Sequence, residues 1–301
     1  MMASPANRTQ RRGPDGQEGD GAVPRIVIGL DTSFVARETL VLAARLAASA
    51  DARLKGVFVE DDNLVALASL PFAREISFSG DVRALDPERM LRAMKAQAES
   101  ARRMLARIAG EAHVDWSFDV RRGRPLSSLA ASASSGDTLV IRAPGESVRE
   151  VGRTVRAATS EARADVLLVS GSAGLRGALP LRASPPLRPA FQPVLPGRPV
   201  GVVDDGSSAG ESCSAFAETL ASRIGASFLR LPAKGKTPAD VAAAARHGGV
   251  GLLVINANWL GGDEDAARLS AAAGCPVLLL GKERGSLFAP APGTEDNNKG
   301  D

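Results

Sequence analysis

The chain contains no tyrosine, two histidines and only two cysteines among its 301 residues. Cys213 and Cys275 are too few for a disulfide framework, and neither has the close Cys or His neighbours that metal ligation needs. This cysteine usage fits a reduced compartment, so we expect a cytoplasmic protein. Aromatic residues make up 4% of the chain, and their scarcity beside many alanines favours helices that pack closely on a sheet.

Long apolar runs are also missing. No stretch is long enough to cross a bilayer, and residues 1–24 lack the apolar core of a signal peptide. We therefore expect no membrane partner. Residues 1–24 and 282–301 are rich in Gly, Pro and charged residues, a composition that buries too little surface to fold, and both are expected to be disordered tails.

The excess of positive over negative charge is concentrated in one segment. The net charge is +3, and residues 172–198 alone carry four arginines and no acid, Arg176, Arg182, Arg188 and Arg198. A nucleic-acid-binding protein usually shows a basic stripe with aromatics on a folded face, whereas this excess lies in a Pro-rich linker. We expect no nucleic-acid partner.

Two stretches with the same design are present. Residues 25–33 (RIVIGLDTS) and 199–207 (PVGVVDDGS) are apolar runs that end in an acid and a hydroxyl, and each is followed by an Ala- and Leu-rich helical segment. Runs without polar alternation indicate strands buried on both faces, as in a parallel sheet. Ligands collect beyond the carboxyl ends of such strands, where Asp31 and Asp205 are expected to lie.

Strands and helices are predicted to alternate after both stretches, which indicates doubly wound parallel sheets. In the first copy we expect further strands at 55–60, 114–120, 138–141 and 165–169, with helices near 33–49, from 86 onward, at 124–135 and within 145–162. In the second copy we expect strands at 200–203, 227–231, 251–255 and 276–280, with helices at 211–223, 239–247 and 263–273. The second copy is shorter by one strand and one long helix.

The sequence therefore predicts an α/β protein with two tandem Rossmann-like domains, 25–171 and 199–281, joined by the linker 172–198. Residues 61–85 form an extra insert, too long for a plain connection, with a short amphipathic piece at 63–70. The helix from Pro87, capped by Asp86, carries an apolar stripe at three-four spacing that indicates a core-facing side, or alternatively a partner-helix face.

Several motifs together resemble the universal stress protein family. They are the opening strand ending in Asp-Thr-Ser or Asp-Gly-Ser, the Gly123-Arg124-Pro125 turn, and the Ala-rich helix running into 274–280 (GCPVLLL). The resemblance covers 25–171 and 199–281 and implies a tandem, UspA-like stress-response protein with the adenine nucleotide alpha hydrolase-like fold. It also implies binding and regulation rather than catalytic turnover.

ATP-binding members of that family carry G-x-x-G, nine residues, then G-S or G-T, so that backbone N–H groups wrap the phosphates. Here the matching stretch is Arg142-Ala143-Pro144-Gly145, six residues, then Gly152-Arg153-Thr154, a degenerate form of the motif. Arg142 and Arg153 are alternatively direct anion ligands or solvated loop residues. In the second domain the acids 263–265 open a helix and would repel phosphate, so we expect no ATP there.

The resemblance places a ligand cleft in the first domain, and its possible occupant is ATP or another adenine nucleotide with Mg²⁺. The lining predicted for this cleft is Asp31, Thr32, Ser33, Val59, Gly145, Gly152 and Thr154. One hypothesis is that nucleotide occupancy biases a partner contact or dimerisation. The other is a non-nucleotide-binding, dimeric interaction scaffold that uses the insert and the closing strands. A hydrolase is a third, more distant alternative.

Three further motifs have plain structural explanations. Residues 206–210 match G-x-S-x-G, yet His113 and His247 are both expected at the opposite edge of the sheet, so a turn with a serine cap is favoured over a serine triad. Gly235-Lys236-Thr237 lacks the first P-loop glycine and is interpreted as a turn capped by Thr237. The acids at 60–62 indicate a solvated loop, or alternatively a cation or sugar contact.

Overall fold

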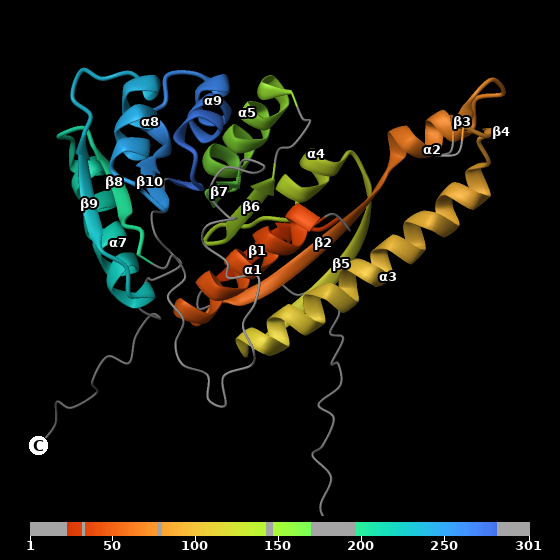
Figure 1. The fold of residues 1–301 in the computed structure, drawn as a ribbon, viewed down its shortest axis with the longest axis horizontal. Helices are drawn as coiled ribbons and strands as arrows, with labels where there is room; N and C mark the ends of the chain where they lie inside the picture. The colour runs from red at the N-terminus through yellow and green to blue at the C-terminus, as the bar shows by residue number, and fades with distance from the viewer. Residues whose placement is uncertain (1–22, 32–33, 77–79, 143–146, 170–196, 282–301) are drawn as a thin grey trace, which may run out of the picture.

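The computed structural model describes residues 23–31, 34–76, 80–142, 147–169 and 197–281, without the side chains of 34–36 and 263. Two helical layers cover a nine-stranded sheet (Figure 1). The predicted disordered tails except residues 23 and 24, and all of the predicted linker except residues 197 and 198, lie outside the described residues. The first half of the chain supplies five strands of the large sheet and the second half supplies four.

The elements of the first half follow the predicted alternation. They are β1 (Arg25–Gly29), α1 (Phe34–Ser49), β2 (Arg53–Asp61), α2 (Asp62–Ala68), β3 (Arg74–Ile76), β4 (Val82–Ala84), α3 (Pro87–Ala112), β5 (Trp116–Gly123), α4 (Pro125–Ala130), β6 (Thr138–Arg142), α5 (Val148–Arg156) and β7 (Asp165–Val169). A π-helical turn, Ala157–Glu161, extends α5. The predicted cap of α3 is confirmed, because the Asp86 carboxylate accepts a hydrogen bond from the Glu88 backbone N–H at 3.0 Å.

The second half repeats this alternation in shortened form. It contains β8 (Val200–Asp204), α7 (Ser208–Ile224), β9 (Phe228–Pro232), α8 (Pro238–His247), β10 (Leu252–Asn256), the 3-10 turn Ala257–Trp259, α9 (Asp263–Ala273) and β11 (Val277–Leu280). Among the described residues it has no counterpart of the edge strand β5 or of the long helix α3, as the sequence predicted.

The order of strands in the sheet is β5-β2-β1-β6-β7-β11-β10-β8-β9. All neighbours are parallel except β7 and β11, which pair antiparallel with Val277 opposite Leu168. The two doubly wound halves therefore meet along their last strands and form one continuous sheet. The sequence predicted two tandem doubly wound units but not how they join, because the apolar runs of β7 and β11 carry no mark of which strand they pair with.

Each face of the sheet is covered by helices from both halves (Figure 1). One cluster of buried apolar side chains packs the sheet against α1, α3 and α7, and the other packs it against α4, α5, α8 and α9. Helix α5 of the first half lies against α9 of the second. Burial of apolar surface, the main force for folding, is thus shared across the junction.

Several predicted boundaries differ from the structure by two or more residues, and two of them have a clear physical cause. The strand predicted at 114–120 is β5, which begins at Trp116, because His113 adopts a left-handed backbone at the end of α3 and the Val114 N–H bonds back to Ala109. The helix predicted at 124–135 ends at Ala130. The chain then turns back on itself, and the Asp137 carboxylate accepts from the Ser134 backbone N–H at 2.7 Å.

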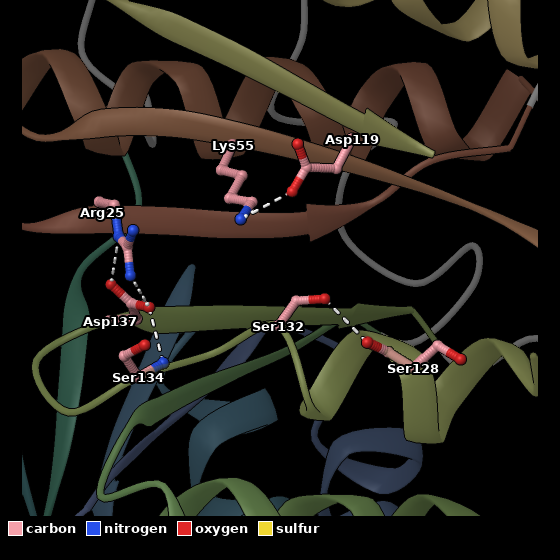
Figure 2. A network of polar contacts seen from close by, with 7 residues as sticks. All are labelled: Arg25, Lys55, Asp119, Ser128, Ser132, Ser134 and Asp137. Carbon is pink, nitrogen blue, oxygen red and sulfur yellow. Dashed lines mark hydrogen bonds and ion pairs between the residues drawn. The ribbon is translucent and has the colours of Figure 1, made fainter. Parts of the chain in front are cut away.

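A polar network ties β1 to the chain that enters β6 (Figure 2). The Arg25 guanidinium donates from Nε and Nη2 to the two carboxylate oxygens of Asp137, both at 2.9 Å. Nearby, Lys55 of β2 pairs with Asp119 of β5 at 2.9 Å. The Arg25–Asp137 contact holds β1 beside the start of β6, and the opposite ends of the same two strands form the candidate site.

Candidate functional site

The candidate site lies where the strand order of the first half reverses. From β1 the chain passes first to β2 on one side and later to β6 on the other, so the carboxyl ends of β1 and β6 border a switch point. In open parallel sheets this is the place where ligands bind. Asp31 follows β1, and Arg142 is the last residue of β6.

Asp31 and Arg142 form an ion pair with each other across the switch point, through Arg142 Nη2 and Asp31 Oδ2. The Arg142 side chain is 15% exposed and the Asp31 side chain is 48% exposed, so the guanidinium lies deeper than the carboxylate. Burial lowers the pKa of Arg142 from its ordinary value. A guanidinium still keeps its charge at neutral pH, and the pair therefore holds a fixed cation beneath a half-exposed anion.

The structure describes four of the seven residues predicted to line the cleft. Asp31 borders the switch point, whereas Thr32, Ser33 and Gly145 lie outside the described residues. Val59 is half-buried on β2 and packs against the cluster beneath α4 and α5.

Gly152 and Thr154 lie inside α5 and not in a loop. Both are buried, and the Thr154 hydroxyl donates to the Glu150 carbonyl at 2.9 Å. The helix begins earlier, at Val148, and its cap is Ser147, whose hydroxyl accepts from the Glu150 N–H at 3.2 Å. The N-terminus of α5, where backbone N–H groups are available to an anion, therefore lies at Ser147 and Val148 and not at Gly152.

Sequence reasoning missed two features here. The first is the role of Ser147, although Ser147-Val148-Arg149-Glu150 fits the S-x-x-E pattern that marks the start of a helix. The second is that Arg142 is the partner of Asp31. The only available signal was that the two residues end strands expected to be neighbours, since 111 positions separate them in the sequence.

The matching positions of the second half are occupied by local turns. Asp205 Oδ1 accepts from both the backbone N–H and the hydroxyl of Ser207, at 2.9 and 2.6 Å, and the hydroxyl bond is the main cause that lowers the pKa of this carboxyl. The buried amide of Asn256 accepts from the Asn258 N–H at 2.8 Å. The acids at the start of α9 include Asp265, which accepts from the Gly262 N–H.

The structural explanations of the two glycine-containing motifs are confirmed. Ser207 caps α7 by accepting from the Gly210 N–H, and Thr237 caps α8 in a reciprocal box with Asp240. His113 and His247 end helices that lead into the amino ends of β5 and β10, across the sheet from Ser208. The solvated loop predicted for the acids at 60–62 was wrong, because β2 continues to Asp61 and α2 begins at Asp62. Asp61 caps α2, and Asp62 pairs with Arg122 at 2.7 Å.

Cys275 is buried, and desolvation raises the pKa of its thiol to about 11. In the described part of the chain no cluster of His, Cys, Asp and Glu has the arrangement of a metal site. Within the same residues, no helix is long and apolar enough to span a membrane.

No protein-family model and no curated protein matches this sequence. Among solved structures, a universal stress protein from Archaeoglobus fulgidus matches 85% of this chain and 96% of its own, with a TM-score of 0.57 and 11% identity. A protein of the universal stress protein family from Burkholderia pseudomallei, 24% identical, matches 48% of this chain and 94% of its own at a TM-score of 0.31. A universal stress protein solved in complex with cAMP is 19% identical and matches 50% of this chain and 98% of its own at 0.32.

The first of these matches spans both halves and shows the fold. The chain is an α/β protein with a mostly parallel, helix-covered sheet, similar in fold to a universal stress protein.

Proposed function

We propose that this chain is a stress-response regulatory protein of the universal stress type that works by contact with other proteins, without converting a substrate. The fold similarity supports the class of protein. The observation that carries the proposal within that class is the ion pair between Asp31 and Arg142 at the switch point. The proposal includes a cytoplasmic location, two domains at 25–171 and 199–281, and neither a nucleic-acid nor a membrane partner.

The ion pair opposes binding of magnesium ATP in the manner of the glycine-loop members. An arginine stands where their first glycine lets the backbone approach phosphate, and it already holds the Asp31 carboxylate. To bind Arg142, a phosphate would have to displace the Asp31 carboxylate from a mostly buried guanidinium. The phosphate would then lie next to the displaced carboxylate, which carries the same sign of charge. Hydrogen bonds between charged groups contribute about 1.5–3 kcal/mol, so this displacement is costly.

Gly152 and Thr154 provide no phosphate contacts that would offset this cost. Both are buried in α5, and the Thr154 hydroxyl is engaged by the backbone of its own helix. The geometry therefore favours the scaffold hypothesis over the nucleotide sensor.

The test is the melting temperature of the full chain with and without millimolar ATP, ADP, AMP or cAMP and Mg²⁺. We expect no shift in the parent protein. A nucleotide at a hundred times its Kd would add about 2.7 kcal/mol, which corresponds to a rise of roughly 5 °C or more. A rise of that size that disappears in Asp31→Ala but persists in Arg153→Ala, an exposed arginine of α5, would overturn the proposal.

One observation favours a second candidate, a sensor of small anions. The Arg142 cation lies beneath an Asp31 carboxylate that is itself half-exposed, so a polyphosphate without a metal ion has a cation to reach once the carboxylate is removed. On this second candidate, tripolyphosphate raises the melting temperature of Asp31→Asn by several degrees and that of the double variant with Arg142→Ala not at all. Equal responses in the two variants would exclude Arg142 as the anion site.

A further inference from the structure

The segment between β2 and α3 extends beyond the helices that cover the sheet (Figure 1). We call residues 62–85, which the structure describes except for 77–79, the arm. It consists of α2 and the two-stranded hairpin of β3 and β4. Ion pairs of Asp62 with Arg122 and of Glu75 with Arg89 tie the arm to β5 and to the first turn of α3.

The β3–β4 hairpin exposes apolar side chains on its outer face. Glu75 points toward Arg89 of α3, and because side chains alternate along a strand, its neighbours point away from the helix. Ile76 and Val82 lie directly opposite each other on that outer face and are 73% and 62% exposed. Antiparallel sheets with one solvated face usually place polar residues on that face. In this hairpin the charged Glu75 faces the helix and the apolar Ile76 and Val82 face solvent.

Exposed apolar side chains are concentrated on the arm. Of the ten large apolar side chains that are exposed in the described residues, six belong to it, Leu64, Leu67, Leu70, Phe72, Ile76 and Val82. Single exposed apolar residues need no explanation, but a group rimmed by charges marks an interaction surface. An isolated two-stranded hairpin is also marginally stable in water, so a covering partner would stabilise it.

We propose that the arm is the dimerisation surface of this protein and that its occupant is the arm of a second copy. The described part of the arm carries both signs of charge in nearly equal number, with acids Asp62, Glu75 and Asp81 and bases Arg74 and Arg83. A mixed surface of this kind complements itself. Anionic lipid or nucleic acid would require a positive excess, which the arm does not have.

The size of the surface agrees with this occupant. The six side chains are 41–73% exposed. Covering all of them would bury roughly 600 Å² per copy, so that two copies reach the lower end of the ~1,200–2,000 Å² that stable interfaces bury. The last strands of the two halves offer no alternative, because β7 and β11 are already paired with each other. That pairing corrects the scaffold hypothesis, which assigned the closing strands to partner contacts.

The mass of the full chain, measured by light scattering during size-exclusion chromatography at about 50 μM, tests this proposal. We expect twice the chain mass of 31.1 kDa for the parent and the mass of one chain for Ile76→Glu combined with Val82→Glu. Both side chains are mostly exposed, so the variant should keep the parent's circular dichroism spectrum and melting temperature. Val148→Glu, at an exposed apolar residue on α5, is the matched control and should remain a dimer.

A parent with the mass of a single chain would overturn the proposal. So would an arm variant that stays dimeric, because the interface would then lie elsewhere. Dissociation of both the arm variant and the Val148→Glu control would mean that any added surface charge breaks the dimer. That result would also contradict the assignment of the interface to the arm.

Discussion

Replacement of Asp137 by alanine is expected to lower the free energy of unfolding by about 3 kcal/mol or more, because it removes a buried carboxylate that pairs with a partly buried guanidinium. The Asp137 side chain is 4% exposed and Arg25 is 33% exposed. Besides both bonds from Arg25, the carboxylate accepts the Ser134 N–H, so the variant also leaves a backbone donor unpaired (Figure 2). Urea unfolding at neutral pH measures the loss.

The control for this experiment is Glu264→Ala, which removes an exposed pair with Arg268 one turn along α9. Pairs of this kind contribute about 0.3–0.5 kcal/mol. Equal losses in the two variants would mean that the Arg25–Asp137 contact does not anchor β1 to the entrance of β6.

The second large effect is expected for Leu167→Ala, in the middle of β7. Leu167 is fully buried and lies opposite Leu278 of β11, at the junction of the two halves. Deletion of a buried leucine side chain beyond its Cβ costs about 2–5 kcal/mol, since the cavity closes only in part. The matched control is Val148→Ala, at an exposed apolar residue of α5 outside the arm, with an expected change below about 0.5 kcal/mol.

The number of transitions in the urea unfolding curve of Leu167→Ala tests whether the two halves of the chain unfold as one unit. Because each buried cluster runs through both halves, we expect one transition that moves to lower urea concentration. Two separated transitions would show that the halves unfold independently and that the contact between β7 and β11 adds little.

Much of the fold could be predicted because strands and helix starts are marked by residues that are close together in the sequence. Buried strands show as short apolar runs, and caps such as Asp86 before Pro87 and Thr237 before Pro238 mark where helices begin. The antiparallel junction could not be predicted, because Asp165–Val169 and Val277–Leu280 are interchangeable apolar runs and pairing depends on tertiary contacts. The β3–β4 hairpin was missed for another reason, since its strands have three residues each and no apolar periodicity.

The candidate site was predicted in part. The position of Asp31 follows from the strand that precedes it. The partner of Asp31 does not, because a contact over 111 positions exists only once β1 and β6 are side by side. The degenerate motif also led the sequence analysis to treat Gly152 and Thr154 as cleft residues, while the capping pattern that begins at Ser147 places both within a helix.

Calorimetric titration of the full chain with magnesium ATP tests the central claim most directly, namely that Asp31 and Arg142 engage each other at the switch point and leave no nucleotide site there. We predict no saturable heat up to millimolar ATP in the parent protein. Binding of one ATP per chain at micromolar Kd, lost in Asp31→Ala, would contradict the claim and restore the nucleotide-sensor hypothesis.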